Sequence, residues 1–120
     1  MKPLIDSTSF GIITINNKSY DHDVVIKSSG DVLKRKKKLS KKIYGTSHKV
    51  SKEEIEFVLE AKTSAIIIGS GQYGVLEISD EAKKVLNKLD VDIHIDKTPQ
   101  ACNFWNSFKG KAVGLFHITC

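Results

Sequence analysis

The sequence predicts a single α/β domain with a β-hairpin region added at its amino end. The chain has 120 residues, which is the usual size of one domain and leaves no room for a second. Three segments with helical periodicity alternate with short apolar runs typical of strands. Before them, the first third of the chain carries short strand-like segments separated by turn residues. We therefore expect one domain over 1–120.

The amino-terminal region is expected to form a hairpin and one or two further strands. Phe10–Ile15 is apolar at positions facing both sides of a strand, and residues 16–18, Asn-Asn-Lys, tolerate a left-handed turn. The partner strand would begin near Ser19. Val24–Lys27 predicts another strand, stopped by a Ser-Ser-Gly-Asp turn, after which Val32 and Leu33 can resume the pairing.

The helix that follows the basic segment has the clearest boundary signals. Ser51 can accept a hydrogen bond as the N-cap, and Glu54 three residues later completes a capping box. Val50 can pack against Ile55 across the helix start. The apolar face of this helix comprises Ile55, Val58 and Leu59.

A buried strand and a second helix come next. Ala65–Ile68 is a continuous apolar run, as expected of a strand covered on both faces. It leads into a glycine-rich turn over 69–74, and 75–78 predicts another strand. Ser79 or Asp80 can cap the second helix. Its inward positions are Ala82, Val85, Leu86 and Leu89.

The last part of the chain predicts a strand, a helix and a final strand. Val91–Asp96 alternates apolar and polar residues, so one face of that strand should be covered and the other wet. Thr98 followed by Pro99 predicts a helix start, with Thr98 as its cap. Gly110 would close this helix, and Ala112–Cys120 would form the final strand.

The glycine-rich turn matches a dinucleotide-binding pattern only in part. Gly69, Gly71 and Gly74 have the G-x-G-x-x-G spacing directly after a buried strand. In that motif a helix opens within the glycines, whereas here strand-like residues intervene before Ser79. No acidic residue stands about 20 positions further at the end of a second strand. The turn is therefore interpreted as a tight loop whose backbone N–H groups can bind an anion or a carbonyl.

This loop would share a crevice with the start of the third helix. If Ala65–Ile68 and Val91–Asp96 are parallel neighbours, their carboxyl ends lie at the same edge of the sheet, where α/β domains bind ligands. The loop 69–74 and the helix start 98–101 would line that edge. A helix amino terminus adds N–H donors and partial positive charge, which favours an anionic ligand.

Three further side chains invite a chemical role, and two interpretations of each stay open. Cys102 is either a packed thiol or a nucleophile near a helix start. His117 is either a hydrogen-bonded structural histidine, pairing with Thr119, or a group that orients a substrate. Asn106 is either an interior hydrogen-bond bridge or a ligand contact. His117 and Cys120 point to opposite faces of a strand and cannot chelate one metal together, so no metal site is expected.

The net charge of +5 comes from one segment. Eight basic residues and no acid lie between Lys34 and Lys49, while the remaining 11 bases face 14 acids, a net of −3. A cluster such as Lys34–Lys42 can hold the phosphates of nucleic acid. The alternative is a solvated loop, because no RNA-binding aromatic motif stands beside it.

The sequence predicts a cytoplasmic location. The longest apolar runs are far shorter than the roughly 20 residues that cross a bilayer, and no export or organelle signal is legible at the amino end. Two cysteines, Cys102 and Cys120, are too few for a disulfide scaffold and indicate a reducing compartment. No cofactor motif is evident, and the oligomeric state is not predictable.

Five motifs in order resemble the adipogenesis-associated Mth-type domain family, a domain of unknown function with a branch of mitochondrial complex I assembly factors. They are Phe10-Gly11-x-Ile13-x-Ile15, Asp23-Val24-x-Ile26, Ile67-Ile68-Gly69-x-Gly71-Gln72-x-Gly74-x-Leu76, Thr98-x-x-Ala101 with Asn106, and Leu115-Phe116-His117-x-Thr119-Cys120. The resemblance covers nearly the whole chain. It implies a three-layer α/β fold with a mixed central sheet, and it implies no reaction or catalytic residue set.

The leading hypothesis is a non-enzymatic binding module for a small anionic ligand or a protein partner. Its expected ligand-binding residues are Gly69, Ser70, Gly71, Gln72, Gly74, Thr98, Ala101, Asn106 and His117. One rival is an enzyme that uses Cys102 or His117. The other is nucleic-acid binding through Lys34–Lys42. The assembly-factor role is not carried over, because no mitochondrial presequence is visible.

Overall fold

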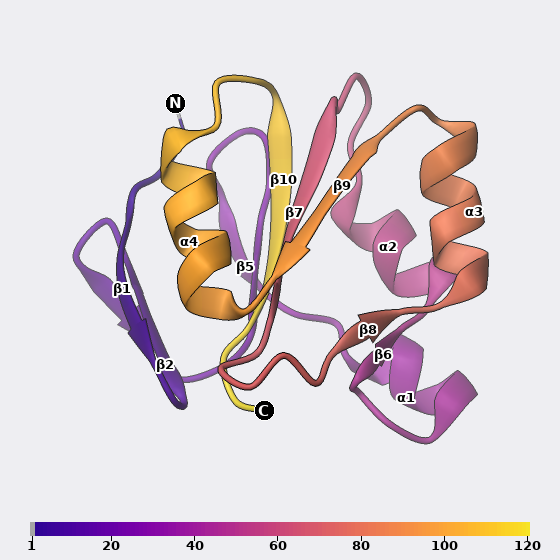
Figure 1. Cartoon of the computed structure of the whole chain (residues 1–120), viewed down its shortest axis with the longest axis horizontal. Helices are drawn as coiled ribbons and strands as arrows, with labels where there is room; N and C mark the ends of the chain where they lie inside the picture. The colour runs from indigo at the N-terminus through magenta and orange to yellow at the C-terminus, as the bar shows by residue number, and fades with distance from the viewer. Residues whose placement is uncertain (1) are drawn as a thin grey trace.

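The computed structural model describes residues 2–120, and it has three layers around a five-stranded mixed sheet (Figure 1). The strand order is β5 (Val32–Lys34), β4 (Val24–Ile26), β10 (Ala112–His117), β7 (Ala65–Ser70) and β9 (Asp92–Asp96). Strands β10, β7 and β9 are parallel, whereas β4 and β5 run antiparallel to their neighbours. The α/β class and the mixed sheet are confirmed.

Helices and two small sheets cover the central sheet on both sides (Figure 1). On one side lie α4 (Thr98–Ser107) and an antiparallel sheet of β1 (Ile5–Ser9), β2 (Ile12–Ile15) and β3 (Lys18–Tyr20). On the other side lie α2 (Lys52–Val58) and α3 (Asp80–Lys88). Helix α1 (Lys38–Tyr44) sits beyond them, beside a two-stranded parallel sheet of β6 (Lys49–Val50) and β8 (Glu77–Ile78).

The amino-terminal hairpin is confirmed, together with one strand that the sequence does not indicate. Asn16 and Asn17 turn the chain with φ of 47° and 66°, a left-handed conformation that asparagine tolerates. Strand β1 precedes this hairpin and pairs with β2. Its sequence, Ile-Asp-Ser-Thr-Ser, buries only Ile5, so no apolar alternation marks it.

Two of the three predicted N-caps, Ser51 and Ser79, are present, and one predicted core position is wrong. Ser51 Oγ accepts a hydrogen bond from Glu54 N at 3.1 Å, and Ser79 Oγ does the same for Ala82 N at 3.1 Å. The capping box is only half formed, because the Glu54 carboxylate turns to other partners. Leu89, expected to face inward, is 58% exposed, since α3 ends one residue earlier.

The central sheet separates two hydrophobic clusters. Ile67 and Phe116 join Trp105 of α4 and the isoleucines of the amino-terminal sheet in one cluster. Ile66 and Leu115 join the other cluster, against α2 and α3. All six residues of β7 and of β10 are buried, as the apolar run in the sequence predicts. Within residues 2–120 no helix combines the length and apolar character needed to cross a bilayer.

The amino-terminal sheet is fastened to α4 by side chains of that helix. Asn106 Oδ1 accepts a hydrogen bond from Ile5 N at 2.9 Å, and Asn106 Nδ2 donates to Ile5 O at 2.8 Å. Trp105 Nε1 donates to Pro3 O at 2.9 Å. The Asn106 amide therefore pairs with β1 as the backbone of a neighbouring strand would, so it forms a hydrogen-bond bridge, although at an exposed and not an interior position.

Replacing Asn106 should loosen this attachment without unfolding the central sheet. Asn106→Ala removes both hydrogen bonds to Ile5 and should lower the free energy of unfolding by about 1–2 kcal/mol, roughly 1 kcal/mol for each bond. Amide exchange at Ile5 should accelerate, while the amides of β7 keep their protection. Asn103→Ala, at an exposed position on the same helix, is the control. Unchanged exchange at Ile5 in Asn106→Ala would contradict this assignment.

Candidate functional site

The edge at which the sequence places a crevice exists, because β7 and β9 are parallel and both end there. The glycine-rich segment 69–74 begins in the last two residues of β7 and continues beyond it at that edge. Its N–H groups bind the chain itself: Gln72 N donates to Thr119 O at 2.7 Å, and Tyr73 N and Val75 N each donate to Cys120 O at 3.1 Å. These backbone N–H groups thus donate to carbonyl oxygens of the segment after β10.

Thr98 has a different role from the helix cap expected of it. The N-cap of α4 is Lys97, which makes no side-chain cap hydrogen bond. Thr98 Oγ1 instead accepts a hydrogen bond from Gly71 N at 2.9 Å and donates one to the carbonyl oxygen of His117. This hydroxyl is fully buried and joins the ends of β7 and β10 to α4. The cap assignment is therefore wrong.

Close packing explains two of the loop glycines. A Cβ on Gly69 would lie 2.8 Å from Thr98 Oγ1, and a Cβ on Gly71 would lie 2.2 Å from the carbonyl carbon of Cys120. Gly71 also has a φ of 104°, which side chains disfavour. The spacing of these glycines thus serves contact with Thr98 and with the last residues of the chain.

The other expected ligand residues are distributed over several places. Ser70 Oγ donates to Asp96 O at 3.0 Å, and Gln72 Nε2 donates to Thr8 Oγ1 at 3.1 Å. Asn106 is bound to β1. Ala101 lines an opening of about 290 Å³ between β9 and α4, beside Phe104. The structure thus brings the loop, Thr98 and His117 together and separates them from Asn106.

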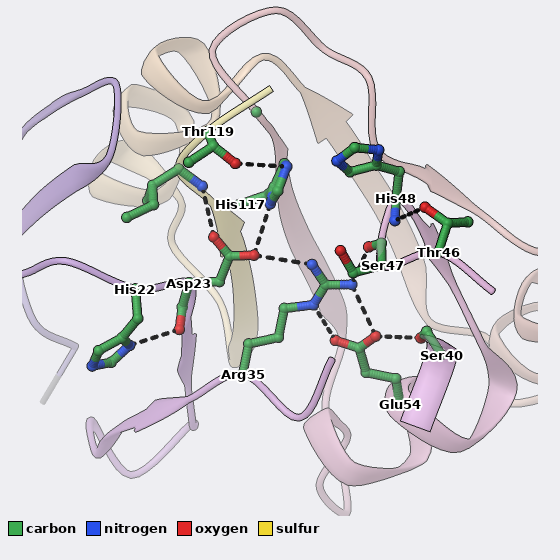
Figure 2. A network of polar contacts seen from close by, with 12 residues as sticks. His22, Asp23, Arg35, Ser40, Thr46, Ser47, His48, Glu54, His117 and Thr119 are labelled. Atoms are coloured by element: carbon green, nitrogen blue, oxygen red, sulfur yellow. Dashed lines mark hydrogen bonds and ion pairs between the residues drawn. The ribbon is translucent and has the colours of Figure 1, made fainter. Parts of the chain in front are cut away.

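His117 is the predicted site residue at which buried charges gather (Figure 2). The residue is 4% exposed, and its Nδ1 lies 2.7 Å from Asp23 Oδ2. Asp23 Oδ1 accepts a hydrogen bond from Ile118 N at 2.9 Å, and Oδ2 also accepts one from Arg35 Nη1 at 2.9 Å. Because a carboxylate only accepts, Nδ1 of His117 carries a hydrogen and Nε2 is left beside Thr119 Oγ1, at 3.4 Å.

Arg35 connects this pair to a second buried carboxylate. Its Nη2 donates to Glu54 Oε1 at 3.1 Å, its Nε pairs with Oε2, and Nη2 also reaches the carbonyl oxygen of Ser47. Ser40 Oγ donates to Glu54 Oε1. Burial acts to lower the pKa of Arg35, but the hydrogen bonds and charges of Glu54 and Asp23 raise it overall. We call this chain, His117–Asp23–Arg35–Glu54, the buried ion network.

Sequence reasoning misses three members of the buried ion network. Arg35 stands within a lysine run and resembles part of a solvated segment, although its guanidinium is suited to bidentate pairing in a way that lysine is not. Glu54 is interpreted from the sequence as half of a capping box. Asp23 enters only as a motif position. The single arginine of the run is the one available signal.

A cavity of about 230 Å³ opens beside the buried ion network. His117 and His48 meet there, with ring centroids 5.4 Å apart, and Figure 2 shows His48 on the side of His117 away from Asp23. Lys34 and Lys37 are the two lysines of its lining. The remaining lining residues are Asp21, His22, Asp23, Arg35, Ser47, Ile118 and Thr119. We call this the His117 cavity.

Cys102 lies away from this cavity, in the hydrophobic cluster around Trp105. Its side chain is almost fully buried, and burial raises the pKa of its thiol to about 12. A thiolate is therefore strongly disfavoured at neutral pH, which is the packed-thiol interpretation. Within residues 2–120 no group of three or more histidine, cysteine or acidic side chains could hold a metal ion.

These features define a small α/β domain in which a mixed sheet carries a polar cavity at the carboxyl end of its central strand. The chain belongs to the DUF498/DUF598 family of proteins of unknown function, whose family model matches residues 5–116. It is similar over its whole length to the conserved hypothetical protein PH1505 of Pyrococcus horikoshii, with 35% identity and a TM-score of 0.91 over all of that chain.

Two further solved structures have the same fold. A protein named MT938 is 32% identical, with a TM-score of 0.85 over 99% of this chain and all of the other. A Bordetella pertussis protein, described as a Mth938-like domain, is 15% identical, with a TM-score of 0.61 over 96% of this chain and 85% of the other. The Mth-type resemblance is thus confirmed at the level of the domain, and none of these descriptions names an activity.

Removing Arg35 should strongly destabilise the protein. Arg35→Met would leave the carboxylates of Asp23 and Glu54 buried beside each other without a cation, at a cost of about 3–5 kcal/mol. Urea unfolding followed by the fluorescence of Trp105, the one tryptophan of the sequence, measures this change. Lys38→Met, at an exposed position of the same segment, should stay within about 0.5 kcal/mol of the parent protein. Equal effects of the two substitutions would show that the fold does not depend on the buried guanidinium.

Asp23 should make the fold sensitive to acid. Burial acts to raise the pKa of Asp23, but hydrogen bonds from His117, Ile118 and Arg35, with the charge of His117, hold it below its ordinary value of 3.8. A carboxyl with a lowered folded pKa stabilises the fold above its unfolded pKa, and this stabilisation is lost as pH falls through the folded pKa. As the pH is lowered below 3.8, the free energy of unfolding of Asp23→Asn should therefore fall less steeply than that of the parent protein. Urea unfolding at a series of acidic pH values gives the slope, and an unaltered slope would exclude Asp23 as the source.

Proposed function

We propose that the protein is a binding module whose His117 cavity holds a small anionic ligand with a phosphate or carboxylate group. The proposal rests on one observation, which is that the Asp23 carboxylate has no free oxygen to offer a ligand. Both oxygens of Asp23 already accept from Ile118 N, Arg35 and His117. The buried carboxylate of the lining is therefore satisfied, and Lys34 and Lys37 offset the charge of Asp21, the exposed carboxylate that also lines the cavity.

The donors around the cavity suit an oxyanion. Lys34 and Lys37 supply positive charge, and neither takes part in the ion pairs found within residues 2–120. Thr119 supplies a hydroxyl group beside His117 Nε2, and Ser47 also lines the cavity. A protonated His117 would donate from Nε2, because Asp23 fixes the hydrogen on Nδ1. Charge-assisted hydrogen bonds of this kind are the strong ones.

The size of the cavity favours a small group. About 230 Å³ is below the range of roughly 300–1,000 Å³ typical of sites that enclose drug-sized ligands. A phosphate or a short carboxylate with its bound water fits such a space. The ligand proposed from the sequence is therefore retained, but its position moves from the loop 69–74 to the neighbouring end of β10, where His117 is the shared residue.

One observation favours a second candidate, an enzyme that uses His117. The Asp23–His117 contact of 2.7 Å resembles the carboxylate–imidazole pair that prepares a histidine to accept a proton. Its nearest hydroxyl, Thr119 Oγ1, lies 3.4 Å from Nε2, longer than a well-formed hydrogen bond. The binding module is preferred because it needs no activated nucleophile.

A protein partner that placed an acidic side chain in the same cavity would use the same donors.

Inorganic phosphate tests the proposal directly. Titrated against the ¹⁵N-labelled protein, it should produce saturable amide shifts concentrated at His48, Ile118 and Thr119, while chloride at equal ionic strength should not. Lys37→Gln should weaken phosphate binding about three- to tenfold, because it removes one charge-assisted contact. Lys83→Gln, on the exposed face of α3, should leave it unchanged. Shifts that do not saturate, or that spread evenly over surface lysines, would contradict the proposal.

A further inference from the structure

The segment from β5 through α1 exposes lysines that form no ion pair within residues 2–120, although Lys36 lies over the Phe57 ring at 5.6 Å. Its exposed lysines lie in β5, in α1 and in the turn between them. No acidic residue occurs between Asp31 and Glu53, and the ion pairs present in residues 2–120 involve only Arg35 and His117 as cations. We call this surface the lysine face; it comprises Lys34, Lys36, Lys37, Lys38, Lys41 and Lys42.

The lysine face is not explained by the stability of the fold. Helix α1 is not predicted from the sequence, because Leu39 and Ile43 alone are too few to mark an apolar stripe, and the helix buries only Ser40. Lys38 and Lys42 stand four residues apart on it, and like charges at that spacing destabilise a helix. The rest of the chain is net acidic, so the positive potential is concentrated at this end of the molecule, where α1 lies in Figure 1.

The lysine face is continuous with the His117 cavity. Lys34 and Lys37 belong to both, since they line the cavity and flank the lysines of α1. A phosphate held between these lysines and His48 would therefore lie at one end of a row of further ammonium groups. A single small anion would leave most of that row without a partner, whereas a chain of phosphates would meet it.

We propose that the natural ligand of the His117 cavity is one phosphate of a single-stranded nucleic acid whose neighbouring phosphates lie along the lysine face. This inference rests on the proposed function. A recessed cavity can receive a phosphate of a flexible strand, whereas a rigid duplex presents its phosphates on a convex surface. Lysines contact phosphates without reading bases, so binding is independent of sequence and falls steeply with salt.

Fluorescence anisotropy of a short labelled oligo(U) strand at several salt concentrations tests this inference. One phosphate in the cavity and one at each of the four other lysines predict a slope of log K against log [salt] of about −3.5, since each contact contributes about −0.7 for a single strand. The triple variant Lys38→Gln, Lys41→Gln, Lys42→Gln should reduce the magnitude of the slope by about 2 and weaken binding at low salt by about tenfold or more. These side chains are exposed, so circular dichroism should show an unchanged fold.

A matched triple variant on another helix separates the lysine face from net charge. Lys83→Gln, Lys84→Gln, Lys88→Gln removes the same charge from exposed positions of α3 and should preserve both slope and affinity. Equal weakening by the two triple variants would overturn the inference. So would the absence of oligo(U) binding at low salt, or a duplex that competes as well as the single strand.

Inorganic phosphate and tripolyphosphate distinguish the failure of this inference from that of the proposed function. The α1 triple variant retains Lys34, Lys37 and His48, so phosphate should still shift the amides around the cavity. Phosphate binding without oligo(U) binding would overturn the nucleic-acid inference and leave the anion site. Tripolyphosphate binding without oligo(U) binding would identify a free phosphate chain and also overturn it. Absence of phosphate binding by the unsubstituted protein would overturn both proposals.

Discussion

The burial of Arg35 is the constraint on which the cavity end of this domain depends. An arginine that is 4% exposed must have its guanidinium surrounded by acceptors, and the chain provides them from the start of β4, from α2 and from the turn before β6. Removing one member of such a network leaves an unpaired charge in the interior, so the fold must bring all of its members into contact. Among residues 2–120 no buried side-chain nitrogen or oxygen lacks a hydrogen-bond partner. The position of His117, and with it the cavity, follows from where Asp23 is held.

Elements with strong local signals could be predicted, and elements held by distant partners could not. The buried strand Ala65–Ser70 and the caps Ser51 and Ser79 follow from apolar runs and from short-range hydrogen bonding. Strand β1 and helix α1 carry no apolar pattern, and they are fixed by Asn106 and by strand β2 in one case and by contact with α2 and β6 in the other. Their partners are chosen by tertiary packing, which a local pattern does not encode.

At the candidate site, the place of the residues could be predicted but their hydrogen-bond partners could not. The residues around Gly71 are correctly expected to lie at one sheet edge, because parallel strands bring their carboxyl ends together. Sequence reasoning could not say what the N–H groups of the loop would bind, since a carbonyl oxygen of the same chain satisfies them as well as an external anion does. For Thr98, local pattern favours a cap, but its hydroxyl is buried beside Gly71 and serves β7 and β10 instead. The pattern identified the residue and misassigned its partner.

The place of β10 in the sheet has a consequence for the order of assembly. It lies between β4 and β7, yet it comes from the far end of the sequence, so its contacts with β4 span about 90 residues of chain. The β4–β5 hairpin and the β7–β9 pair can each form early, but neither has a neighbour to join until β10 enters between them. Sheets closed by such distant contacts fold slowly, because loop-closure entropy is lost before the contacts are gained. Until β10 enters, the inner edges of β4 and β7 are open to pairing with other chains, so the insertion of β10 is the step that removes both exposed edges.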